Sequence, residues 1–198
     1  MLCYILLDFT DSHITSIFSY HSFVQKPSIL FRKEGNIMEH SDQERQIIVT
    51  GGAIIRDKQH RILWQKRSDS NDWGLPGGGM HAGETVEETM LREVKEETGL
   101  EVISSTLYAV YSGERLKYTY PGGDDVVFVM FIFDVVADLE GKLASDGKTL
   151  LFEDEDHESV TLVFYPISEM NIEQINPAQR ALFEDLNQQS QSQSILRQ

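Results

Sequence analysis

The chain has 198 residues, 40% of them hydrophobic, which is enough material for one core and predicts one domain, or two at most. Its formal net charge of -15 at pH 7 argues against nucleic acid held on a basic surface. The single cysteine, Cys3, excludes an intrachain disulfide, and no apolar run reaches the roughly 20 residues of a membrane span, so we expect a cytoplasmic protein, monomeric or homodimeric, without membrane partners.

The first 37 residues are balanced in charge, with three acidic and three basic residues, so the whole net charge of -15 lies after them. Lys33-Glu34-Gly35 can be encoded by a sequence that contains a bacterial ribosome-binding site, and Met38 follows at a workable spacing. We hypothesise that residues 1–37 are an N-terminal extension translated from upstream sequence and that the natural start is Met38. The alternative is an extension peculiar to this protein, and the intact mass of material from the native source distinguishes the two.

Runs of apolar and β-branched residues predict strands, and clusters of Gly, Pro and Asp predict the turns between them. The predicted strands cover residues 46–55, 62–65, 101–112, 126–136 and 160–165. A helix is predicted after Asn176-Pro177, since Pro suits the first position of a helix. Antiparallel hairpins mixed with helices predict an α+β layered domain.

A glycine run follows the second predicted strand. Lys66 and Arg67 end that strand and are candidates for binding substrate phosphates, although cations at strand ends usually serve solubility only. The three glycines Gly77, Gly78 and Gly79 come shortly afterwards and allow backbone to approach a ligand closely. Alone, such a run is a weak signal, because most glycine runs are flexible turns.

A well-marked helix comes next. Thr85 and Glu88 have the spacing of a capping box, which begins a helix, and Gly99 supplies its end. At about 100° per residue, Val86, Met90 and Val94 form one apolar stripe. The stripe predicts the face of the helix that packs on the core.

Three glutamates, Glu93, Glu96 and Glu97, share an arc of about 100° beside the apolar stripe. The simplest interpretation is a solvated acidic face. Like charges three and four residues apart repel each other, however, and Glu97 lies against the side that should be buried. A divalent cation removes both difficulties, and ligands that are all oxygen favour Mg2+ or Mn2+ over zinc.

Two other segments have chemical interest. Trp73, Tyr118 and Tyr120 are candidates for stacking a nucleobase, although aromatic residues near strands are more often core or rim packing. Residues 188–198 are polar and of low complexity, which predicts a flexible tail.

The helix and its glycines fit a known pattern. Gly78, Glu84, Arg92-Glu93-Val94, Glu96-Glu97 and Gly99-Leu100 occupy every fixed position of the Nudix box, G-x5-E-x7-R-E-U-x-E-E-x-G-U with U apolar. The chain therefore resembles a Nudix hydrolase over roughly residues 46–186, and a Nudix domain is expected at 38–187. The resemblance implies a mixed sheet sandwiched between helices, an α/β/α sandwich.

The resemblance also implies roles for residues. The metal ligands would be Glu93, Glu96, Glu97 and the backbone carbonyl of Gly77. Arg92 would brace the site through Glu84 or Glu93, and Gly78, Glu84 and Gly99 would be structural supports. Glu93 is the first choice for the general base, and the alternative is Glu158, which resembles the family's later acid but ends an acidic run, 153–158, of a kind that is usually a solvated loop.

The implied reaction is Mg2+- or Mn2+-dependent hydrolysis of a nucleoside diphosphate linked to another group, by attack of water on phosphorus. A small nucleotide is the expected substrate, by default a nucleoside triphosphate or a similar compound, since no proline lies where the ADP-ribose type of the family would place it. The alternative is a module that keeps the fold and binds a nucleotide without cleaving it. Such relatives usually lose box glutamates or gain a DNA-binding domain, and the intact glutamates therefore favour the enzyme.

Overall fold

The computed structural model describes residues 45–120, 122–152, 158–188 and 195–198. The predicted N-terminal extension, residues 1–37, lies outside this part, as does most of the acidic run before Glu158. In the described part, no helix is long and apolar enough to cross a membrane.

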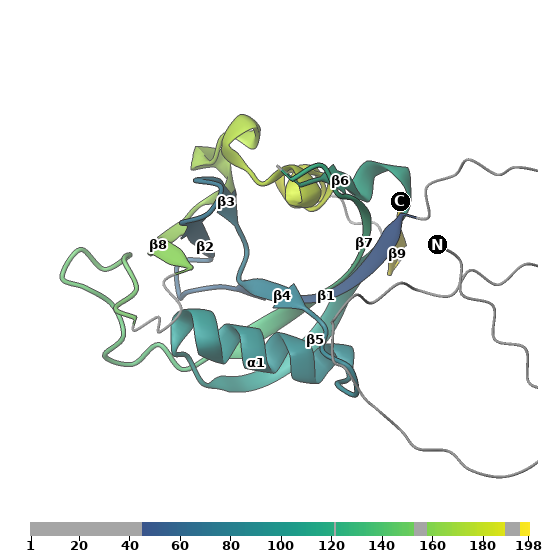
Figure 1. The fold of residues 1–198 in the computed structure, drawn as a ribbon. Coiled ribbons are helices and arrows are strands. Elements are labelled where there is room, and N and C mark those ends of the chain that lie inside the picture. Colours follow the sequence, from purple (N-terminus) through teal and green to yellow (C-terminus); the bar gives the residue numbers. More distant parts are fainter. Residues whose placement is uncertain (1–44, 121, 153–157, 189–194) are drawn as a thin grey trace, which may run out of the picture. The chain divides into compact units, whose positions relative to one another are not determined.

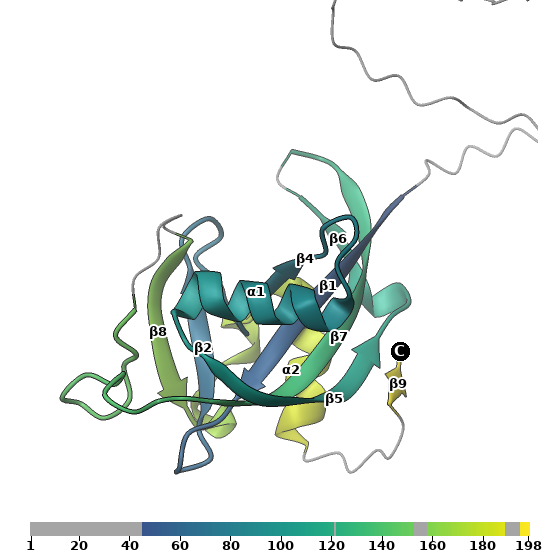
Figure 2. The same ribbon diagram turned by 90° about the horizontal axis from the view of Figure 1, so that it is seen from below.

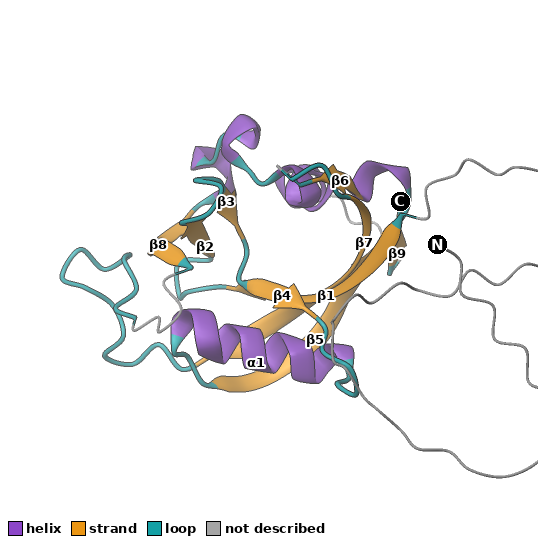
Figure 3. Ribbon diagram, viewed as in Figure 1, coloured by secondary structure: helices purple, strands orange, loops and turns teal. Residues whose placement is uncertain are grey.

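Figure 3 shows the strands between the helices. The strands are β1 (Gln46–Ile55), β2 (Ile62–Arg67), β3 (Trp73–Gly74), β4 (Gly77–Gly79), β5 (Val102–Tyr111), β6 (Lys117–Thr119), β7 (Asp125–Ala137), β8 (Ser159–Tyr165) and β9 (Leu196–Arg197). The five predicted strands lie close to their predicted positions, as β1, β2, β5, β7 and β8, and the four short strands β3, β4, β6 and β9 were not predicted. The helices are α1 (Val86–Thr98) and α2 (Arg180–Asn187), with 3-10 turns at Glu114–Leu116, Ile167–Glu169, Ile172–Gln174 and Pro177–Gln179.

Two sheets make up the described domain. The larger one has the order β4-β1-β7-β5-β9, with β6 also paired to β7. Its central pair, β1 and β7, runs parallel from Gln46 opposite Val126 to Ile55 opposite Val135, whereas β5 and β7 are antiparallel. The smaller sheet has the order β3-β2-β8. The large sheet is thus mixed, as the family resemblance implied.

The two helices cover opposite faces of the large sheet (Figures 1 and 2). Side chains alternate along a strand, so β1 contributes to both sides. Ala53 and Ile55 pack in one cluster with Met90 and Val94 of α1. Ile54 packs in the other cluster, together with the buried residues of α2. This layering confirms the predicted α+β sandwich.

Helix α1 begins and ends where the sequence predicts. The hydroxyl of Thr85 accepts a hydrogen bond from the amide of Glu88 (3.1 Å), and the carboxylate of Glu88 accepts one from the amide of Thr85 (2.8 Å). Gly99 closes the helix with φ of 68°. Met90 and Val94 have no exposed surface, and Glu97 is only 3% exposed, so the helix buries a carboxylate beside its apolar stripe.

The last residues of the predicted polar tail differ from that prediction. Leu196–Arg197 pairs with Val110 and Tyr111 at the edge of β5. The guanidinium of Arg197 donates to the carboxylate of Asp185 (2.8 Å) and to the hydroxyl of Tyr111 (3.1 Å). One buried ion pair therefore holds the end of a segment whose composition predicts no structure.

Candidate active site

A cleft of about 550 Å³ opens beside the glycine strand and helix α1. Its walls come from β1, β4, α1 and the β6-β7 hairpin, together with residues 67–70, Glu158 and residues 176–179. One end holds the carboxylates of Glu93 and Glu97, and the walls also include aromatic and aliphatic side chains. Polar and apolar parts of a ligand can therefore be held in the same cleft.

Glu97 is the buried acid of the cleft. One carboxylate oxygen accepts a hydrogen bond from the side-chain amide of Gln65 (3.0 Å), and the other accepts one from the backbone amide of Gly77 (2.8 Å). The nearest cation, Arg67, stays 3.9 Å from the carboxylate. Because burial removes water from this carboxyl group, its pKa rises to about 7. Glu97 thus has two neutral hydrogen-bond donors, and its long ion pair with Arg67 does not offset the effect of burial on its pKa.

Glu93 lies one helical turn before Glu97 and faces the same cleft. Burial raises the pKa of the Glu93 carboxyl group, although the hydrogen bond from Arg92 (2.7 Å) opposes the rise. A Cβ atom at Gly78 would lie 2.5 Å from this carboxylate. The absence of a side chain at Gly78 therefore lets the acid approach the glycine strand.

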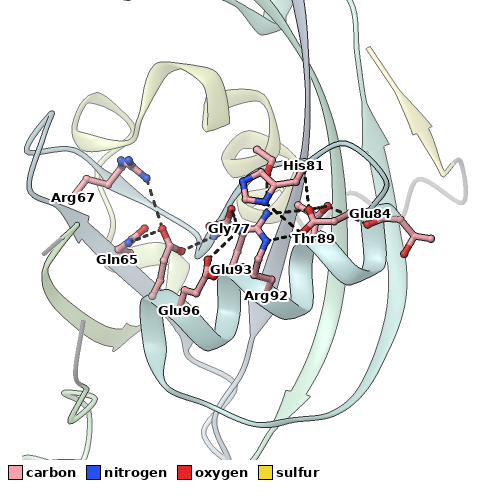
Figure 4. A network of polar contacts seen from close by, with 12 residues as sticks. Gln65, Arg67, Gly77, His81, Glu84, Thr89, Arg92, Glu93 and Glu96 are labelled. Carbon is pink, nitrogen blue, oxygen red and sulfur yellow. Dashed lines mark hydrogen bonds and ion pairs between the residues drawn. The ribbon is translucent and has the colours of Figure 1, made fainter. Parts of the chain in front are cut away.

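Arg92 joins the box acids to the glycine strand (Figure 4). Its guanidinium donates to both oxygens of Glu84 (2.7 and 3.1 Å), to Glu93 and Glu96 (2.7 and 3.0 Å), and to the carbonyl of Gly79 (2.9 Å). Hydrogen bonds from Arg92 and from the amide of His81 lower the pKa of Glu84 to about 2. This geometry fits the bracing predicted for Arg92 and Glu84.

The three predicted carboxylate ligands are not gathered in one place. Glu93 and Glu97 line the cleft, whereas the Glu96 side chain is 52% exposed and paired with Arg92. Within the described ranges, no three His, Cys, Asp or Glu side chains are grouped so as to hold one ion. Mg2+ commonly takes one or two carboxylates and completes its shell with water and substrate phosphate, so the pair Glu93 and Glu97 fits that ion without a third acid.

The remaining predicted site residues divide into two groups. Glu158 and Arg67 both line the cleft, and Arg67 forms two hydrogen bonds with Asp69 (3.1 Å each). The ammonium group of Lys66 instead lies 5.4 Å from the ring centre of Trp73, and Lys66 is not among the residues of the cleft wall. The structure therefore brings Arg67, but not Lys66, to the carboxylates.

Aromatic rings gather on the β6-β7 side of the cleft. Tyr118 and Tyr120 meet edge to face with ring centres 5.1 Å apart, and Phe128 lies 6.2 Å from Tyr118. All three line the cleft. Trp73 instead packs against Tyr165 and does not line the cleft.

Sequence reasoning missed two residues of the site: Gln65, which bonds Glu97, and Gly51, which lines the cleft. Gln65 is fully buried in β2 after three buried apolar residues, so an unexpected polar residue in an apolar strand was the available signal. A Cβ atom at Gly51 would lie 2.7 Å from the carbonyl oxygen of Val86, so this glycine allows α1 to pack closely on β1. A glycine pair inside a predicted strand was the corresponding signal.

Known proteins resemble this chain in sequence and in fold. A family model described as the NUDIX domain matches residues 47–186. An ADP-ribose pyrophosphatase of Methanocaldococcus jannaschii is 34% identical over 141 residues, which cover 70% of this chain and 79% of that protein. An RNA pyrophosphohydrolase of Edwardsiella ictaluri is 47% identical over 49 residues, 25% of this chain and only 28% of that protein. Among solved structures, a MutT protein from Methanosarcina mazei Go1 has a TM-score of 0.54 at 21% identity, covering 75% of this chain and 99% of that one.

Proposed function

The chain belongs to the Nudix family of hydrolases, which act on phosphoanhydride bonds, and we propose that it uses Mg2+ or Mn2+ to cleave a nucleoside diphosphate linked to another group. The observation that carries the proposal is the pair of cleft carboxylates, Glu93 and Glu97. Glu97 is 3% exposed, accepts hydrogen bonds from two neutral N–H groups, and forms a long ion pair with Arg67 (3.9 Å). A buried carboxylate with one long ion pair remains unfavourable in its charged form, and a bound metal ion would offset that cost.

In this reaction the residues of the chain would have separate roles. Glu93 and Glu97 hold the metal, with Glu96 and the carbonyl of Gly77 as the other predicted ligands. Arg92 keeps Glu93 oriented through its bonds to Glu84 and Gly79. Arg67, at the same end of the cleft, binds a phosphate oxygen. When bound, the metal neutralises pyrophosphate oxygens and lowers the pKa of the attacking water.

Two acids remain candidates for taking the proton from water. Glu93 lines the cleft, and its carboxylate lies so close to Gly78 that a Cβ atom there would be 2.5 Å away. Glu158 lies in the same cleft on the smaller sheet and is close enough to influence the pKa of Glu93. We assign Glu93 as the base. If Glu158→Gln lost turnover while its metal affinity stayed that of the wild type, the role would move to Glu158.

ADP-ribose is the first substrate to test. The relative that matches most of its own length is named for hydrolysis of this compound. The RNA pyrophosphohydrolase match spans only 49 residues, 25% of this chain, and the chain's net charge of -15 does not favour RNA. An adenine ring fits the aromatic side of the cleft, where Tyr118 and Tyr120 offer ring faces and edges.

A substrate panel tests the proposal. The protein is incubated with Mg2+ and ADP-ribose, other nucleoside diphosphate derivatives or nucleoside triphosphates, and the products are separated by chromatography. We expect hydrolysis that EDTA stops and that Glu97→Gln abolishes while circular dichroism remains unchanged. Full activity of Glu97→Gln would remove Glu97 from the site, and activity undiminished by EDTA would refute the metal dependence.

A further inference from the structure

Gln65 is a buried polar residue without a role in the proposed reaction. It lies on β2 with no exposed surface. Its side-chain nitrogen donates to Glu97 (3.0 Å) and to the hydroxyl of Ser159 (2.8 Å). Figure 4 shows Gln65 pointing from β2 towards the acids of α1. The amide therefore joins the smaller sheet to the helix that carries the box.

The side-chain oxygen of Gln65 indicates that the hydrogen bonds of the side-chain nitrogen have a specific role. The oxygen of Gln65 is buried and has no hydrogen-bond partner among the described residues. An unpaired buried oxygen costs stability, and reversing the amide would direct that oxygen at the carboxylate of Glu97. The orientation is therefore set by the two acceptors, and an apolar residue would avoid this cost at the same position.

The neutrality of Gln65 matters as much as its hydrogen bond. Gly77 binds the other oxygen of Glu97, also through a neutral N–H group (2.8 Å). Two neutral donors on separate strands fix the plane of the carboxylate, and the guanidinium of Arg67 stays 3.9 Å from it. A lysine or arginine at position 65 would compete with a metal ion for that charge.

We propose that Gln65 is a positioning residue for the metal site, which holds the Glu97 carboxylate in the orientation that binds the cation. This inference rests on the proposed function, because it takes Glu97 as a metal ligand. Gln65 itself touches neither metal nor substrate. Outer hydrogen-bond partners of metal ligands typically change metal affinity by about 10- to 100-fold when they are removed.

The test measures Mn2+ binding without substrate. Gln65→Met keeps the length of the side chain and removes the donor, and electron paramagnetic resonance reports free Mn2+ during titration. We expect the dissociation constant for Mn2+ to rise by about 10- to 100-fold while the circular dichroism spectrum stays that of the wild type. Gln65→His, which can again donate an N–H, should recover part of the loss. If Gln65→Met fails to fold, Gln65→Asn, whose amide is one methylene short, should show the weakened binding.

Thr98→Val is the matched control. Thr98 is also buried, adjoins Glu97 in the sequence, and bonds only backbone groups of Val94 and Leu100. Its substitution should lower the melting temperature and leave Mn2+ affinity unchanged. Equal weakening in Thr98→Val and Gln65→Met would overturn the inference, since general loosening would then explain both.

Failure of this inference differs from failure of the proposed function. If the wild type binds Mn2+ and hydrolyses a nucleotide, unchanged affinity in a folded Gln65 variant overturns the positioning role alone. If the wild type binds Mn2+ but cleaves no nucleotide, the proposed reaction fails and the positioning role is judged by the affinities. A wild type that neither binds Mn2+ nor cleaves any nucleotide with Mg2+ or Mn2+ present overturns both.

Discussion

Replacing Glu97 with Gln should change how the stability of the metal-free protein depends on pH. In the folded chain the pKa of Glu97 is raised from 4.5 to about 7 by burial. A raised pKa means that folding favours the protonated acid, so this contribution is complete below about pH 4.5 and is lost as pH rises through about 7. Since one pKa unit corresponds to about 1.4 kcal/mol, the loss amounts to about 3 kcal/mol.

Denaturant titrations in EDTA measure this effect. The free energy of unfolding is determined for the wild type and for Glu97→Gln from about pH 5 to about pH 8, because the difference between the two proteins cancels the other titrating groups. We expect the wild type to lose about 3 kcal/mol relative to the variant across this range, since the neutral amide cannot ionise.

Added Mg2+ supplies the second half of the experiment. At about pH 8 the ion should raise the melting temperature of the wild type and leave that of Glu97→Gln almost unchanged, because a ligand stabilises only the state that binds it. A stability difference that stays flat with pH would refute the reasoning about burial. An equal Mg2+ response in both proteins would refute the assignment of Glu97 as a ligand.

Three further substitutions test other parts of the structure. Gly51→Ala should lower the free energy of unfolding by about 1–3 kcal/mol in denaturant titrations, because a Cβ atom at this position would lie 2.7 Å from the backbone of α1. An unchanged free energy of unfolding would show that the helix shifts freely. Arg92→Lys should lower kcat and raise the Mg2+ concentration needed for half-maximal activity, because an ammonium group cannot reproduce the two parallel hydrogen bonds by which the guanidinium holds Glu84. A variant whose activity depends on Mg2+ as that of the wild type does would contradict this. Thr85→Ala should cost about 1 kcal/mol in a thermal melt through loss of the cap, with kcat unaffected, and an unaltered melting temperature would mean that the cap is dispensable.

The sequence predicted well those parts of the fold that depend on residues close together in the chain. The ends of α1 depend on Thr85 and Gly99, which act within one turn, and its buried face follows from helical periodicity. The parallel pairing of β1 with β7 was not predictable from the residues alone, because roughly 80 residues separate the partners and no local signal encodes their register.

The site shows the same division. The box predicted Glu93, Glu96 and Glu97 as ligands, and the structure brings the first and last of them to the cleft. Glu96 is exposed and paired with Arg92, which the pattern did not indicate. Gln65 was visible as a polar residue in an apolar strand, but its partner Glu97 is 32 residues away. Composition likewise predicted a loose tail, and the ion pair of Arg197 could be found only with the fold in hand.

The hydrogen bonds of Gln65 also have a mechanical meaning. The bond to Ser159 stays within the smaller sheet, whereas the bond to Glu97 crosses to the helix that packs on the larger sheet, so the site depends on the two sheets keeping their distance. Small sliding of one sheet against the other would pull the amide from the carboxylate before either sheet lost a strand. Under mild denaturant or rising temperature, metal affinity should therefore decline earlier than secondary structure, which would make bound Mn2+ a sensitive gauge of how firmly the two sheets are joined.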